Sequence, residues 1–97
     1  MSITVVSRWK APQESQALAR QAGPIIRRHG ASMVRLGFCY SGAFAGQFIV
    51  VADYENWETY GSGMKAMVED PEYKGLVAEA MAKYELVDRG IVISEEI

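Results

Sequence analysis

The stretch from Phe48 to Tyr73 reads FIVVADYENWETYGSGMKAMVEDPEY, and it decides the fold. Its apolar, β-branched beginning is typical of a buried strand, expected over Gln47 to Ala52. Asp53 and Asn56 are each able to cap the helix that follows. Asp70-Pro71-Glu72 then supplies a capping acid, a proline at the first helical position and an acid in the first turn. The stretch therefore predicts one strand and a helix that is split near Asp70-Pro71.

Both halves of this split helix carry apolar residues at helical spacing. The inward positions predicted for the first half are Trp57, Tyr60 or Gly61, Met64, and Met67 or Val68. Those predicted for the second half are Tyr73, Leu76, Val77, Ala80, Met81 and Tyr84. Glycine weakens a helix by about 1 kcal/mol relative to alanine, so Gly61 and Gly63 predict a bend in the first half.

The chain before this stretch predicts a strand over Ser2 to Lys10 and then a helix. Pro12 and Glu14 suit the first helical turn. The apolar stripe of this helix comprises Leu18, Ala22, Ile25 and His29. Gly30 fits the left-handed position that ends a helix, after cations in the last turn. Pro24 predicts a kink or break, because an internal proline costs about 3 kcal/mol.

The remaining segments complete a sheet. Ala31 to Tyr40 predicts a strand, and the short small-residue loop SGAFAG joins it to the next strand as an antiparallel hairpin. Glu85 to Ile97 predicts the final strand, most clearly Gly90 to Ser94. The order is β-α-β-β-α-β, so we expect a ferredoxin-like α+β fold, with four antiparallel strands and the helices on one face.

Composition limits the function classes. Apolar residues make up 49% of the 97 residues and charged residues 23%, and this length supports one core, so we expect a single domain over 1–97. Ten basic against twelve acidic residues give a net charge of -2, and no apolar run approaches about 20 residues, so neither nucleic acid nor a membrane is an expected partner. The lone Cys39 and the lack of a leader before Ile3 predict a reducing cytoplasm.

The predicted strands are apolar on both faces, whereas helices cover only one face of such a sheet. Phe48, Ile49, Val50 and Val51 show this most clearly, and Met33 to Phe38 and Ile91 to Ile93 repeat it. A bare apolar face of this size is unusual on a monomer. We therefore expect a homodimer whose subunits pack sheet against sheet, although central strands are also more apolar than edge strands in general.

The complete layout, with Trp57 and Tyr60 followed by Asp70-Pro71-Glu72-Tyr73, resembles the dimeric α+β-barrel superfamily. That superfamily includes antibiotic-biosynthesis-type monooxygenases, NIPSNAP-like proteins, stress-responsive barrel domains and small isomerases. The resemblance implies sheets packed into a dimeric barrel. It fixes no single activity, because one fold hosts several reactions.

The resemblance also bears on cofactors. Its haem-degrading members use a histidine on the second long helix, and residues 54–84 contain none. The only histidine, His29, is explained by its place at a helix terminus. One histidine and one cysteine make no metal-ligand cluster. We therefore expect no haem, no metal and no other cofactor.

Some members of the superfamily oxidise electron-rich aromatic compounds without a cofactor, and they use Asn, Trp, Tyr and Arg side chains to hold the substrate. On that resemblance the candidate pocket is formed by Trp57, Tyr60, Met64, Arg35 and Tyr84, and the catalytic residues are unassigned. Core packing is the more common role for aromatic and methionine residues at this spacing, and it remains the alternative explanation.

Three hypotheses for the function follow. The first is a homodimer that binds a small apolar or aromatic compound in the cleft between sheet and helices. The second is a cofactor-independent monooxygenase or a small isomerase. The third is a structural dimer without catalysis. An RNA-binding sheet is disfavoured, because Gly46 to Val51 offers one aromatic residue and no Lys or Arg.

Overall fold

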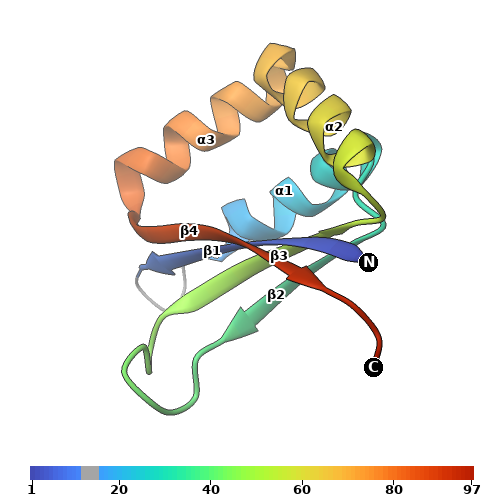
Figure 1. The fold of residues 1–97 in the computed structure, drawn as a ribbon. Coiled ribbons are helices and arrows are strands. Elements are labelled where there is room, and N and C mark those ends of the chain that lie inside the picture. Colours follow the sequence, from blue (N-terminus) through green and yellow to red (C-terminus); the bar gives the residue numbers. More distant parts are fainter. Residues whose placement is uncertain (12–15) are drawn as a thin grey trace.

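The structure is a computed structural model, and it describes residues 1–11 and 16–97. Its elements are β1 (Ser2–Lys10), α1 (Ala17–Arg28), β2 (Met33–Phe38), β3 (Phe48–Tyr54), α2 (Trp57–Glu69), α3 (Pro71–Lys83) and β4 (Glu85–Ser94). The strands form one sheet in the order β2-β3-β1-β4, and all neighbours are antiparallel. The three helices lie on one side of this sheet (Figure 1). The predicted ferredoxin-like α+β fold is confirmed.

Strand register places the core on the face that the helices cover. Ile3 and Val5 of β1 are paired with Tyr54 and Ala52 of β3, and all four are buried. They pack with Ile26 of α1 and with further residues of α2 and the α1–β2 loop. A second, smaller cluster lies at the other end of the sheet and comprises Leu18, Phe48 and Tyr84.

The boundaries around β3 differ from the prediction. β3 continues to Tyr54 instead of ending at Ala52, so Asp53 belongs to the strand and bonds Thr4 across it at 2.7 Å. Asn56 is therefore the residue that caps α2, and its Oδ1 accepts a hydrogen bond from the Thr59 N–H at 2.8 Å. Cross-strand pairing in the sheet extended the strand beyond what its apolar run indicates.

α1 is one continuous helix, so the chain does not break at Pro24, and of the predicted kink or break only the break is contradicted. Pro24 is exposed, so water can satisfy the carbonyl that loses its partner. The neighbouring Ile25 and Ile26 are buried, and their packing offsets the cost of the proline. Gly30 has a φ of 110°, which confirms the left-handed helix end. Pro12 and Glu14 lie outside the described residues.

Asp70 connects the start of α3 to the end of α1. Its Oδ1 accepts a hydrogen bond from the Glu72 N–H at 2.9 Å and so caps α3, which confirms the predicted split. Its Oδ2 is bonded by His29 Nε2 at 2.7 Å and by Arg28 Nη2 at 2.8 Å, at the end of α1. These hydrogen bonds hold the pKa of the Asp70 carboxyl well below its ordinary value, and the bond from His29 contributes most.

α2 passes very close to the end of α1 at Gly63. A Cβ at this position would collide with the His29 carbonyl oxygen, and it would also press on the Tyr54 ring. Gly61, two residues earlier on the same helix, faces open space. The missing side chain at Gly63 therefore serves close helix packing.

We predict opposite effects for alanine at these two glycines. Gly63→Ala should lower the free energy of unfolding by about 2 kcal/mol, because backbone must move to admit the Cβ. Gly61→Ala should raise it by about 0.5–1 kcal/mol, because alanine is the better helix former and meets no neighbour. Urea denaturation of both variants measures the difference, and equal effects would contradict the close approach.

Candidate functional site

The space between the sheet and α3 is only partly filled. No residue of α3 is buried, and the apolar side chains of Val77 and Met81 are 36% and 54% exposed. α3 packs mainly on α1 and α2. Figure 1 shows that it extends away from β4 toward the end of α2. Two adjoining cavities lie under it, and together they are called the cleft below.

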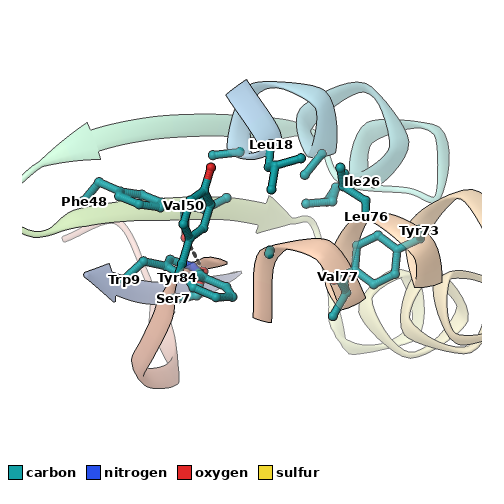
Figure 2. Close-up of a pocket in the computed structure, with 13 residues that line it drawn as sticks. Ser7, Trp9, Leu18, Ile26, Phe48, Val50, Tyr73, Leu76, Val77 and Tyr84 are labelled. Atoms are coloured by element: carbon teal, nitrogen blue, oxygen red, sulfur yellow. Dashed lines mark hydrogen bonds between the residues drawn. The ribbon is translucent and has the colours of Figure 1, made fainter. Parts of the chain in front are cut away.

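The first cavity has a volume of about 90 Å³ (Figure 2). Three aromatic rings lie at one end of it. Trp9 stacks on Phe48 at 6.3 Å between ring centroids, and Tyr84 meets both rings edge-on. The Trp9 Nε1–H donates to Ser7 Oγ at 3.0 Å, so the indole is already satisfied. Val77 and Tyr73 of α3 close the other end.

The second cavity has a volume of about 150 Å³. It shares Ser7, Trp9, Ile26, Val50, Tyr73 and Val77 with the first, so the two cavities adjoin. Its other lining residues include Tyr54, Met64, Met67, Met81 and Arg89. A cavity of this volume with an apolar lining holds a single benzene-sized ring.

Arg89 is the only cation that lines either cavity in the described part of the chain. Its Nη2 lies 3.3 Å from Met64 Sδ, a weak acceptor. Within residues 1–11 and 16–97, no carboxylate forms an ion pair with it. The cleft therefore presents a guanidinium whose charge is not neutralised beside an apolar space.

Tyr54 supplies the second polar group of the cleft. The residue is 1% exposed, and its hydroxyl has no hydrogen-bond partner among the described residues. Burial, together with a smaller contribution from the neighbouring Tyr73, raises the pKa of Tyr54 to about 12, although Arg89 opposes this shift. The phenol thus stays protonated at neutral pH and has a proton to donate.

The structure separates the five residues of the predicted pocket. Met64 and Tyr84 line the cleft. Tyr60 lies behind its wall, with its ring edge-on to Tyr54 at 5.4 Å, and Trp57 packs on Tyr60 and is 46% exposed. Arg35 points to the sheet face without helices and forms an ion pair with Asp53 at 3.1 Å.

Sequence reasoning did not select Ser7, Trp9, Tyr54 or Arg89 for the pocket. Trp9 has the same parity as Ile3 and Val5, so strand alternation could have indicated it. Arg89 is paired with Ser7 in the regular part of the β1–β4 register, so it lies on the same face of β4 as Ile91 and Ile93. Strand alternation groups Arg89 with Ile91 and Ile93, but it does not say which of the two apolar faces of β4 the helices cover.

Clusters of metal-ligating side chains and long apolar helices are the features that would indicate a metal site or a membrane span. No group of three or more His, Cys, Asp or Glu side chains there is arranged to hold a metal ion. No helix there combines the length and the apolar character that crossing a bilayer requires. Cys39 is a half-buried free thiol, and Arg8 Nη1 lies 3.9 Å from its Sγ.

Comparison with known proteins gives a fold likeness without a close relative. No protein-family model and no curated protein matches the chain significantly. SnoaB, a cofactor-independent oxygenase from Streptomyces nogalater solved as a mutant, has a TM-score of 0.73 at 11% identity and covers 99% of this chain and 95% of its own.

Two further solved structures extend this likeness. A dimeric ferredoxin-like protein from an uncultured marine organism has a TM-score of 0.67 at 8% identity, over 98% of both chains. A NIPSNAP family protein of unknown function from Agrobacterium tumefaciens has a TM-score of 0.64 at 9% identity, over 94% of this chain and 86% of its own. The expected superfamily resemblance is confirmed in fold, and at these identities it transfers no activity.

We predict that Tyr54→Phe stabilises the protein. Removing a buried hydroxyl that has no partner should raise the free energy of unfolding by about 1 kcal/mol. Tyr40→Phe is the matched control, because Tyr40 is 97% exposed and should change nothing. Urea denaturation at pH 7 measures both, and a loss of stability in Tyr54→Phe would show that the hydroxyl is bonded.

The same variant has a pH signature. The unfolded chain releases the phenolic proton near pH 10 and the folded chain near 12, so this part of the stability is complete below pH 10 and is lost as pH rises toward 12. Tyr54→Phe should therefore show a weaker loss of stability over this range than the unaltered protein.

Proposed function

We propose that this protein binds a small apolar or aromatic compound in the cleft under α3. The observation that carries the proposal is the pair of adjoining cavities between sheet and helices, lined by aromatic and aliphatic side chains with a few polar groups. Small-molecule sites commonly combine these features. A helix that only completed a core would bury its apolar face, and α3 does not.

Cavity size favours a compact ligand. The larger cavity, at about 150 Å³, matches one aromatic ring, and the smaller one adds room for a substituent. Typical pockets for drug-sized ligands measure about 300–1,000 Å³. The proposed ligand therefore has one ring, and a fused polycyclic compound would require α3 to move.

Arg89 and Tyr54 favour a ligand that carries an oxygen, preferably an anionic one. The guanidinium has no carboxylate to neutralise it among the described residues, and the phenol of Tyr54 is protonated and without an acceptor there. A carboxylate or phenolate between them would accept charge-assisted hydrogen bonds. Such a ligand would supply the partner that each group lacks.

A cofactor-independent monooxygenase is the second candidate function. The likeness to SnoaB, which is described as a cofactor-independent oxygenase, favours it. Arg89 and the Tyr54 phenol could stabilise an anion of an electron-rich aromatic substrate, as such chemistry requires. A small isomerase would use the same two groups, Arg89 and the Tyr54 phenol. A purely structural dimer would need neither group.

The second part of the proposal is a homodimer formed through the sheet face that lacks helices. Val6, Ile49 and Val51 lie side by side on this face, and Val92 extends it at the edge. Its charged groups are paired within the chain, as Arg35 with Asp53 and Arg8 with Asp88 show. A second sheet could therefore cover it without burying an unpaired charge from these groups.

The proposed setting of this dimer is the cytoplasm. Cys39 is a free thiol, and the sequence has no second cysteine with which to form an internal disulfide. Free thiols persist in reducing compartments. Its proposed partners are a second copy and a small ligand.

Ligand binding is tested with benzoate and its neutral analogue benzamide, by NMR shifts of the Trp9 indole N–H and by the change in Tm. We expect saturable binding of both, tighter for benzoate. Arg89→Gln should weaken benzoate by about tenfold and leave benzamide unchanged. Oxygen uptake with hydroquinone separates an oxygenase from a binder.

A bulky substitution gives the control for this experiment. Val77 lines both cavities, so Val77→Phe should abolish binding, whereas Val68→Phe on the exposed side of α2 should not. Absence of saturable binding by any single-ring probe would overturn the ligand proposal.

The dimer is tested by analytical ultracentrifugation. Val51→Glu places a charge at the centre of the proposed interface and should raise the dimer dissociation constant by roughly a hundredfold or more. Val68→Glu is the matched control, because Val68 is exposed on α2. An unaltered protein that sediments as a monomer at micromolar concentration would refute the dimer.

A further inference from the structure

Two arginines of α1 have no anionic partner in the described ranges. Arg8, Arg28 and Arg35 each form an ion pair with a carboxylate, whereas none is formed there by Arg20 or Arg27. The two are seven positions apart, which is almost two helical turns, so they project from nearly the same side of α1 about 10 Å apart along its axis. Their positive charges are available to a ligand.

Between these arginines the surface is hollowed into a groove. The groove has a volume of about 470 Å³ and runs between α1 and β2. Gly23 and Pro24 lie between the two arginines, and a Cβ on Gly23 would find its nearest neighbour, Val34 Cγ1, at 4.0 Å. The missing side chain at Gly23 therefore opens space that a ligand could use.

The lining of the groove is suited to an anion with an apolar body. Its floor is made by the aliphatic side chains of Val34, Leu36 and Val50. Arg35 also lines the groove, but its guanidinium is directed to the other face of the sheet, where Asp53 binds it. No acidic side chain of the described chain lines the groove, in a protein whose net charge is -2. The positive charge here is thus local.

The groove is open because β2 is the outermost strand of the sheet, so no further strand of this chain covers it. It shares only Ala19 and Val50 with the first cavity of the cleft. These two residues form the wall between the spaces, so the groove is a separate site. Arginines lie at its rim and apolar residues form its floor.

We propose that the groove between α1 and β2 binds an organic anion, with its phosphate or carboxylate held by Arg20 and Arg27 and its small apolar body on the aliphatic floor. The volume lies within the usual range for small-molecule sites. Arginine guanidinium groups bind phosphate and carboxylate through paired hydrogen bonds. This site is independent of the ligand proposed for the cleft.

The test is an NMR titration with inorganic phosphate, phenyl phosphate and phenylacetate at constant ionic strength. We expect saturable shifts at the Nε–H signals of Arg20 and Arg27 and at the Gly23 amide. Phenyl phosphate should bind roughly tenfold more tightly than inorganic phosphate, because its ring covers the apolar floor. Comparison of phenyl phosphate with phenylacetate shows which acidic group is preferred.

Three variants control the charge and the shape of the groove. Arg20→Gln with Arg27→Gln should remove binding, whereas Lys65→Gln with Lys74→Gln changes the net charge equally at exposed lysines elsewhere and should retain it. Gly23→Leu should fill the hollow and block phenyl phosphate without loss of stability, because its Cβ meets no close neighbour.

Four outcomes would overturn the proposal. They are shifts that do not saturate, equal affinity for phosphate and phenyl phosphate, binding that survives the double arginine variant, and shifts confined to Trp9 and Arg89. The last outcome would place the anion in the cleft and support the ligand proposed there. Loss of benzoate binding in the cleft would leave the groove proposal unaffected.

Discussion

The bonds around Asp70 determine how the helical layer is built. One carboxylate caps α3 through the Glu72 N–H and accepts hydrogen bonds from His29 and Arg28 at the end of α1. These donors stabilise the charged carboxylate and lower its pKa. Because Pro71 follows it, the chain cannot continue α2 and must turn at this point. The direction of α3 over the sheet starts here.

The cleft is a consequence of that turn. Gly63 lets α2 lie directly on the end of α1, so the junction of the helices is tight. α3 then leaves this junction and packs on α1 and α2 without burying any of its residues. The apolar faces of α3 and the sheet remain partly apart, and the cavities occupy the space between them. The tight packing of α2 on the end of α1 and the loose packing of α3 over the sheet are therefore parts of the same helix arrangement.

Charge distribution divides the surface into regions with different chemistry. Paired ions such as Arg35 and Asp53 lie on the sheet face without helices, where they leave little net charge to bury. Arg89 at the cleft and Arg20 with Arg27 at the α1–β2 groove have no carboxylate partner among the described residues. These arginines therefore form local positive sites in a protein whose net charge is -2.

The sequence by itself determined the order of the elements, the split at Asp70-Pro71 and the helix end at Gly30, because caps, prolines and left-handed glycines act locally. Its pocket candidates include Met64 and Tyr84, which line the cleft. Only the tertiary structure decided that Arg35 leaves the cleft and that Arg89 and Tyr54 enter it. These placements depend on which face of each strand the helices cover and on how the strands are paired, as Arg89 with Ser7 and Arg35 with Val51 show. Local chemistry does not encode either.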